Sequence, residues 1–286
     1  MLKAIIFRAE ELIFNEDYLQ FKLYEKLWHY LRSGPEWNDF ETVLKFREYY
    51  LAEKKTIPPY EIIAANYLSE RDRKRFEQDV ALFLKKQSSF YLRSIPAMLA
   101  LIRNLKYYYK IALIANEGSL FEKVKRKYRF DRLFHYMTQL ERSADINRFH
   151  QHLNFLIKQI RASTAETLLV SSYLYPDIFA SEQQGIPALY TSFDARTRGF
   201  QPQNYYERKY YHSLQRSLEN RKKDLTRQAR IEALATKPSE ISKFISQLER
   251  TDSSTGYEPV SIPPENVTLW DMAREIFAFP NPSEKT

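Results

Sequence analysis

The sequence predicts an α/β protein with a doubly wound parallel sheet, an inserted helical block and a helical C-terminal extension. Short apolar runs that read as strands alternate with helical segments from Pro96 to Tyr190, and one further apolar run, Ala4 to Phe7, stands at the N-terminus. Strands that alternate with helices are typical of a parallel sheet. The intervening stretch from Asn15 to Phe90 shows helical periodicity throughout, which indicates an insertion after the first strand.

The strands are predicted from short apolar runs that end in polar turns. Ala4-Ile5-Ile6-Phe7 has this form, which is typical of a strand buried on both faces of a parallel sheet. The same reasoning predicts strands at 108–115, 167–170 and 187–190 and a short strand at 133–137. Helices are expected at 96–105, 120–128, 145–160 and 178–184.

The chain is expected to divide into four parts. Residues 1–14 and 91–193 would form the α/β core, and residues 15–90 the helical insertion. Residues 194–250 would form a basic helical extension, with one helix from Tyr205 to Ala235 and a second after Pro238. Residues 251–286 are predicted to be a polar linker followed by a short amphipathic docking helix at 267–279.

Composition narrows the classes of protein. The chain has 286 residues, 44% hydrophobic, so it can bury a sizeable core, and no run approaches the ~20 apolar residues that span a bilayer. The absence of cysteine excludes disulfides and thiolate metal sites, and we expect a cytoplasmic protein. The net charge of +8 suits acidic partners or nucleic acid. With only 5 glycines, a glycine-rich phosphate loop is not expected.

The residues after the first strand are the first candidates for a site. In open α/β sheets, ligands bind beyond the carboxyl ends of the strands. The first strand is followed here by Arg8-Ala9-Glu10-Glu11-Leu12. A guanidinium stays protonated and has no lone pair to offer as a nucleophile. The end of this strand therefore carries a cation where many enzymes of this architecture would carry a reactive group.

The order of elements from Met1 to about Ser192 resembles the haloacid dehalogenase-like (HAD) hydrolase superfamily with a helical cap after the first strand. In that family the first strand ends in a nucleophilic Asp, with an acid/base Asp two residues later and then a Thr. The matching positions here are Arg8, Glu10 and Leu12.

The other three motifs of the family are also altered. A Ser or Thr followed by Asn is matched by Ala115 and Asn116, and the family Lys by Ser143, with Arg142 beside it. The family Gly-Asp with a second Asp a few residues later is matched by Ser172 and Asp177, so that only the second Asp is kept.

The resemblance therefore implies a HAD-like protein without an intact catalytic site. No cofactor is expected, and no metal, because Mg²⁺ needs carboxylate oxygens and only Asp177 is retained. We hypothesise that Arg8 replaces the charge of the metal and bridges Asp177 and Glu10 as a structural ion pair; the alternative is that Arg8 extends to solvent. His135, His150 and His152 are predicted to be surface residues, because an i, i+2 pair does not share a helix face.

The predicted role is that of an interaction or scaffold protein that binds a protein partner through its C-terminal extension. A divergent hydrolase that uses Glu10, Asn116 and Asp177, with Mg²⁺, is the first alternative. A module that binds nucleic acid through the basic helix is the second, since that helix interleaves cations with tyrosines. The candidate partner-binding residues are Arg208, Lys209, Tyr210, Tyr211, Arg221, Lys222, Lys223, Trp270 and Phe277.

Overall fold

The computed structural model describes residues 1–52, 57–141, 145–228 and 233–253. The chain forms two compact units, each assembled from separate stretches of the sequence. Unit 1 consists of Met1–Ile13, Ile95–Phe193 and the residues from Lys222 on, and unit 2 of Phe14–Ser94 and Asp194–Arg221.

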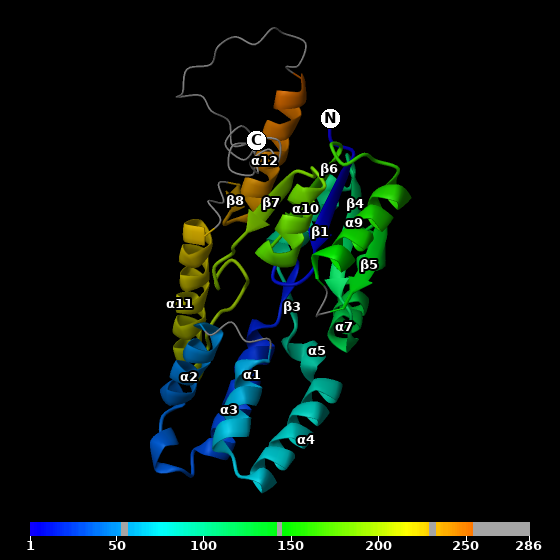
Figure 1. Ribbon diagram of the computed structural model, residues 1–286. Coiled ribbons are helices and arrows are strands. Elements are labelled where there is room, and N and C mark those ends of the chain that lie inside the picture. The colour runs from blue at the N-terminus through cyan, green and yellow to red at the C-terminus, as the bar shows by residue number, and fades with distance from the viewer. Residues whose placement is uncertain (53–56, 142–144, 229–232, 254–286) are drawn as a thin grey trace, which may run out of the picture. The chain divides into compact units, whose positions relative to one another are not determined.

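Unit 1 is built on a six-stranded parallel sheet with the strand order β5-β4-β1-β6-β7-β8 (Figure 1). The first strand of the chain lies near its centre, between β4 and β6, and all of its residues are buried. Burial on both faces explains why it is a continuous apolar run instead of an alternating one. The strands are β1 (Ala4–Arg8), β4 (Lys110–Asn116), β5 (Tyr136–Leu140), β6 (Thr167–Ser171), β7 (Ala188–Thr191) and β8 (Leu234–Ala235).

The register of the central strands brings three chain segments to one edge of the sheet. Arg8, the last residue of β1, pairs with Ile114 of β4, and Phe7 pairs with Val170 of β6. All three strands run in the same direction, so the residues that follow them leave the sheet together. This edge holds the candidate site.

The helices of unit 1 cover the sheet. Helices α9 and α10 lie over one face, where Phe149, Leu153 and Leu156 of α9 pack against alternate strand residues such as Ile6 and Ile114 (Figure 1). The helix α9 begins after Asp145, whose carboxylate accepts a hydrogen bond from the Arg148 backbone N–H at 2.9 Å. The helical segments are α6 (Pro96–Leu105), α7 (Ser119–Tyr128), α8 (Phe130–Leu133), α9 (Ile146–Ile160), the π-helical turn η2 (Leu174–Ile178), α10 (Phe179–Gln183) and α12 (Pro238–Ser253).

Unit 2 is mainly helical. Its core includes Phe21, Phe40, Phe200 and Tyr210, whose rings contact one another in edge-to-face and tilted pairs. Its elements are β2 (Phe14–Asn15), α1 (Asp17–Leu31), η1 (Pro35–Trp37), α2 (Phe40–Ala52), α3 (Pro59–Tyr67), α4 (Glu70–Lys86), α5 (Ser88–Tyr91), β3 (Arg93–Ser94) and the part of α11 (Tyr205–Gln228) up to Arg221.

A charged pair ties the two stretches of unit 2 together. Arg198 donates two hydrogen bonds to the carboxylate of Asp17, at 2.8 and 2.7 Å, and both side chains are buried. Arg47 lies over the rings of Tyr24 and Tyr210 and donates to Ser213 and Ser217. The residues Asp194–Arg221 are therefore packed into a common core with the inserted helices.

The structure corrects several predicted boundaries. The helix expected from Tyr205 to Ala235 ends at Gln228, and Leu234–Ala235 is the edge strand β8, paired with Tyr190 and Thr191. The short strand expected at 133–137 is wrong by three residues, because Phe130–Leu133 forms a helical turn before β5. The pair β2–β3 was not predicted. Two-residue strands are too short to show a period in the sequence.

The extension predicted at 194–250 is divided between the two units at Arg221–Lys222. The first three residues of the predicted linker, 251–253, belong to the helix α12. Ser143, the rest of the linker and the docking helix with Trp270 and Phe277 lie outside the described residues. In the described part of the chain, no helix is long and apolar enough to cross a membrane.

Candidate functional site

Arg8 stands at the carboxyl end of β1 and is the centre of the candidate site. Its side chain is only 5% exposed, and its Nε lies 3.1 Å from Glu10 Oε2 and 3.7 Å from Asp177 Oδ2. Both contacts proposed for Arg8 from the sequence are thus present in the structure, and the side chain does not extend to solvent. The guanidinium is an ion-pair partner of two carboxylates.

Glu10 and Asn116 connect the ends of β1 and β4. The Asn116 backbone N–H donates to Glu10 Oε1 at 2.6 Å, and Arg8 Nη2 donates to the side-chain oxygen of Asn116. The hydroxyl of Ser172, the residue after β6, donates a hydrogen bond to the Glu10 backbone carbonyl at 2.9 Å. This bond links the end of β6 to the segment that follows β1. Of the predicted site residues, the structure therefore brings together Arg8, Glu10, Asn116, Ser172 and Asp177. Ala115 is buried within β4.

Asp177 is fully buried on the turn η2 that follows β6. Burial raises the pKa of its carboxyl group to about 6, although the guanidinium of Arg8 and the hydrogen bond from Ser171 act in the opposite direction. The Ser171 hydroxyl donates to Asp177 Oδ2 at 2.6 Å. The carboxyl group is thus held by two neighbours in a dry environment.

Ser171 and Tyr173 belong to the site but were missed by the sequence analysis. The Arg8 guanidinium carbon lies 5.1 Å from the centre of the Tyr173 ring, a cation–π distance. Ser171 also accepts a hydrogen bond from the Tyr173 backbone N–H at 3.0 Å. The signal was present in the sequence, because Ser171-Ser172-Tyr173 directly follow a strand adjacent to β1, at the edge where ligands bind.

One cation, Arg8, is shared by two carboxylates in this cluster. Burial alone lowers the pKa of Arg8, but the negative charges of Asp177 and Glu10 hold it above its ordinary value. In the described part of the chain, Arg8 Nε, Arg8 Nη1 and Asp177 Oδ1 are buried atoms of this cluster without a hydrogen-bond partner. Arg8 is therefore a permanent cation that its surroundings stabilise mainly by charge.

Known proteins were compared with the chain at the level of sequence and of structure. No family model and no curated protein matches the sequence. Solved structures do match, among them a proposed beta-phosphoglucomutase from Thermotoga maritima (TM-score 0.53, 13% identity), with 86% of this chain and 99% of that chain covered. A HAD-superfamily hydrolase of subfamily IA from Geobacter sulfurreducens matches with a TM-score of 0.50 and 13% identity, over 66% of this chain and 87% of that chain.

The chain has the HAD-like fold. The resemblance inferred from the order of elements is thereby confirmed for the architecture. A likeness at 13% identity shows the fold alone, so the assignment of individual motif positions, Arg8 at the nucleophile position above all, stays a prediction. Ser143, the predicted counterpart of the family Lys, lies outside the described residues.

Magnesium does not fit the residues that this HAD-like core presents. A Mg²⁺ ion needs hard oxygen ligands in octahedral geometry, whereas the two carboxylates here already share the guanidinium that lies between them. Ser172, the predicted counterpart of a family ligand, donates a hydrogen bond to the Glu10 backbone carbonyl. Among the described residues, no three His, Cys, Asp or Glu side chains are grouped so that they could hold a metal ion.

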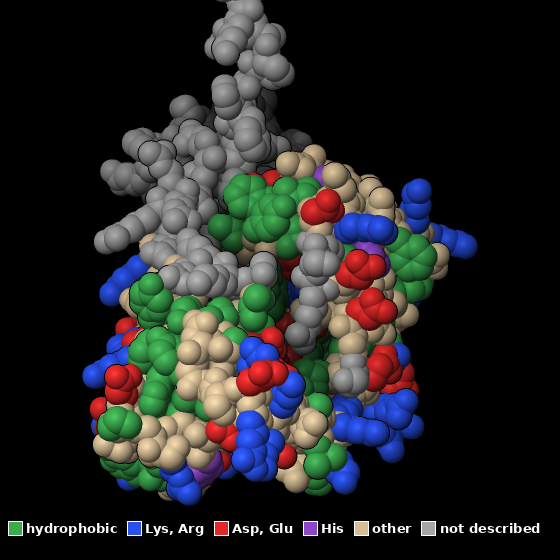
Figure 2. All heavy atoms as spheres, turned by 60° about the horizontal axis from the view of Figure 1, so that its bottom comes forward, with side chains coloured by type: hydrophobic (Ala, Val, Ile, Leu, Met, Phe, Trp, Pro, Cys, Tyr) green, Lys and Arg blue, Asp and Glu red, His purple; other side chains and the backbone are tan. Residues whose placement is uncertain are grey.

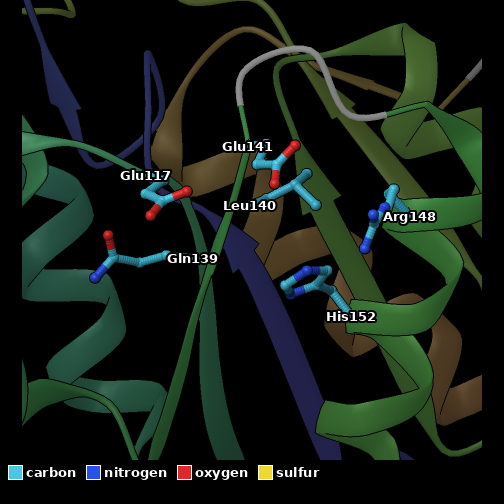
Figure 3. Close-up of a pocket in the computed structure, with 6 residues that line it drawn as sticks. All are labelled: Glu117, Gln139, Leu140, Glu141, Arg148 and His152. Atoms are coloured by element: carbon cyan, nitrogen blue, oxygen red, sulfur yellow. The ribbon is translucent and has the colours of Figure 1, made fainter.

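A pocket of about 280 Å³ lies at the carboxyl ends of β4 and β5 of the HAD-like core. Figure 3 shows Arg148 and His152 extending from α9 toward β5. His152 Nδ1 and the Thr138 hydroxyl are hydrogen-bonded at 2.7 Å, which resembles a nucleophile–base pair. However, burial and the positive charges of Arg148 and Arg8 lower the pKa of His152. An imidazolium formed by proton transfer would stand beside two guanidiniums, so the pair is poorly suited to that chemistry.

The prediction of surface histidines is wrong for two of the three. His150 and His152 are half-buried on α9, and His150 Nε2 lies 2.9 Å from the Ala180 carbonyl. His135 is exposed, as expected. The sequence placed His150 and His152 on a helix, but it did not show that their side chains contact neighbouring elements, Ala180 of α10 and Thr138 of β5.

The structure separates the candidate partner-binding residues of α11. Tyr210 is 1% exposed and belongs to the core of unit 2, so it is excluded as a binding residue. Lys209 forms an ion pair with Glu41, and the neighbouring cation Arg216 pairs with Glu48 at 2.8 Å. Arg208, Lys222 and Lys223 are exposed, and Tyr211 and Arg221 are half-buried. Figure 2 likewise shows basic and acidic side chains next to one another on the visible face.

Proposed function

We propose that this protein is a catalytically inactive HAD-like protein that acts as an interaction or scaffold protein. The observation that carries the proposal is the position of Arg8. A buried guanidinium ends β1 and makes ion pairs with Glu10 and Asp177. The place where the fold would present a nucleophile is filled by a group that cannot attack phosphorus.

The charge balance of the cluster supports the same conclusion. A carboxylate nucleophile and a bound Mg²⁺ would each need free carboxylate oxygens. Here both carboxylates face a permanent cation, and one of them also receives a backbone N–H. The arrangement joins the ends of β1, β4 and β6, and it uses both carboxylates as ion-pair partners of Arg8 instead of as a nucleophile.

The proposed partner is a protein that binds the C-terminal extension. With Tyr210 excluded, the exposed residues that remain for this role on α11 are Arg208, Lys222 and Lys223. Residues 251–286, with Trp270 and Phe277, are the second part of the proposed binding region, and their role is a prediction from the sequence alone. We call this region, the exposed residues of α11 together with residues 251–286, the arm.

A phosphatase assay tests the absence of catalysis. Purified full-length protein would be incubated with Mg²⁺ and a panel of phosphate monoesters, with the Asp177→Asn variant in parallel. We expect no turnover above the buffer rate for either protein. Turnover by the native chain that the Asp177→Asn variant lacks would overturn the proposal and favour the alternative, a divergent hydrolase that uses Glu10, Asn116 and Asp177.

The arm is tested by deletion of residues 254–286, which removes none of the strands or helices of the two units that the structure describes. In a crosslinking pull-down from the native source, partners that the full chain captures should be lost with the deletion or with Arg208→Glu combined with Lys222→Glu. Retention of all partners by both variants would refute the proposed arm.

A further inference from the structure

A basic hollow lies at the amino-terminal edge of the sheet in unit 1, away from Arg8. It has a volume of about 600 Å³, within the range of roughly 300–1,000 Å³ common for ligand sites. Its walls come from the end of α6, the turn before β4, and the connection from α7 to α8 before β5. The lining residues are Arg103, Lys106, Tyr107, Tyr128, Arg129, Arg132 and Leu133.

The hollow is positively charged. Four of its lining residues are cations, and no Asp or Glu is among the described residues that line it. Arg103, Arg129 and Arg132 form no ion pair with any acidic side chain in the described part of the chain, in contrast to Lys209 and Arg216 of α11. Asp131 lies in the same segment but does not line the hollow. The cations are therefore available for a ligand.

The backbone holds these cations in place. The Lys106 ammonium donates to the Arg132 backbone carbonyl at 2.6 Å, which joins the end of α6 to α8. Arg129 has φ 53°, and this left-handed residue ends α7 and begins α8 without an intervening loop. The pKa of the neighbouring His135 is lowered, mainly by partial desolvation of its ring and further by the positive charges of Lys106 and Lys110.

Aromatic rings accompany the cations. Tyr107 is 85% and Tyr108 80% exposed, the highest values among the large hydrophobic side chains that the structure describes. Tyr128 lines the hollow as well. A single exposed ring is ordinary, but several exposed apolar groups gathered at one place mark an interaction site. Cations that can contact a phosphate backbone, together with rings on which bases stack, are the two components of single-strand binding surfaces.

We propose that this hollow, built around Arg103, Tyr107, Arg129 and Arg132, binds single-stranded nucleic acid. The rings favour a single strand over a duplex, because paired bases are stacked on each other and do not present their faces. They also favour nucleic acid over a phosphopeptide, which would engage the cations but leave the rings unused. The site is distinct from α11, to which the sequence analysis assigned this function as an alternative.

Fluorescence anisotropy with a labelled single strand of about 12 nucleotides, within the site sizes known for such surfaces, tests the proposal on the full-length chain. Combining Arg103→Glu with Arg132→Glu should weaken binding at least tenfold and reduce the slope of log affinity against log salt by about 0.7 for each lost phosphate contact. Tyr107→Ala with Tyr108→Ala should weaken binding about tenfold and leave that slope unchanged, because stacking is not a counterion effect.

The controls match these variants in charge. Lys86→Glu with Lys158→Glu changes the net charge by the same amount at exposed positions elsewhere, and Lys222→Glu with Lys223→Glu tests α11. Both should bind like the native chain. If the Arg→Glu variant does not fold, Arg103→Gln with Arg132→Gln replaces it, with an expected loss of several-fold.

Several outcomes would overturn the proposal. These are no binding of the single strand, equal binding of the native chain and the Arg103/Arg132 variant, or a loss caused only by the α11 variant. Tighter binding of a duplex or a phosphopeptide than of the single strand, or complete competition by a free mononucleotide, would assign the hollow to that ligand instead.

Discussion

The guanidinium of Arg8 lies 3.1 Å from the carboxylate of Glu10, two residues further along the chain, at the point where β1 leaves the sheet. Asp177, in the turn η2 after β6, and Asn116, the last residue of β4, contact the same guanidinium. Three strands of the core are thus joined at their carboxyl ends by one side chain. Four predictions follow from this geometry and from the buried pair of unit 2.

Loss of the Arg8 cation should destabilise the fold. Arg8→Met leaves Glu10 and Asp177 side by side in a buried site without a counter-charge, which typically costs about 3–5 kcal/mol. Urea denaturation at neutral pH measures this free energy. Arg126→Met, at an exposed position of α7, should change it by less than about 0.5 kcal/mol. Adding Glu10→Gln and Asp177→Asn to Arg8→Met should restore much of the stability, and a failure of Arg8→Met to destabilise would refute a structural role.

The stability should depend on pH through Asp177. Its pKa in the folded protein is about 6, above the ordinary value of 3.8. A raised pKa stabilises the fold at low pH, and this contribution is lost as the pH rises through the folded-state value. The difference in unfolding free energy between the native chain and Asp177→Asn should therefore fall by up to about 3 kcal/mol between pH 4 and pH 7, at 1.36 kcal/mol per pKa unit. A difference that is flat or rises over this interval would contradict the assignment.

Magnesium should not stabilise the protein. A ligand that binds only the folded state raises the melting temperature with its concentration, and the cation Arg8 already lies between the two carboxylates that would bind the ion. Thermal melts with and without MgCl₂, against NaCl of matched ionic strength, should coincide within about 1 °C. Arg8→Asp removes the cation and adds a carboxylate, so a Mg²⁺-dependent rise is expected for that variant. A rise for the native chain would mean that the site binds metal.

The bidentate ion pair between Arg198 and Asp17 should stabilise unit 2. Arg198→Lys keeps the charge but loses the fork of two hydrogen bonds, at a cost of about 1–3 kcal/mol. Arg196→Lys, an exposed position two residues away, is the matched control and should be neutral. Chemical denaturation compares the two, and equal effects would show that the fork is not needed.

The charges at the end of β1 could be predicted from the sequence, because the strand and the charged residues that follow it are neighbours in the chain. An apolar run followed by Arg8 and Glu10 specifies a buried strand with charges at its exit, and the order of elements indicated the HAD-like core. The start of α9 was also readable, because Asp145, where a helix was expected to begin, caps that helix with its own side chain.

The partners of these groups could not be read in the same way. Ser171 and Tyr173 joined the Arg8 cluster unpredicted, and the edge strand β8 was missed because two residues carry no period. Tyr210 was assigned to a surface from its charged neighbours, but it is buried among aromatic rings of residues far away in the sequence. The cytoplasmic location and the protein partner stay predictions.

The sequence by itself determined the strand-and-helix order of the core and the cation at the end of β1, because each depends on residues that are close together in the chain. Only the tertiary structure decided that Arg8 is paired instead of solvated, and which cations of this basic chain remain open to a ligand. Two of the side chains that hold Arg8, Asn116 and Asp177, lie more than 100 positions from it in the chain. Their contacts arise from packing in space, which leaves no periodic trace in the sequence.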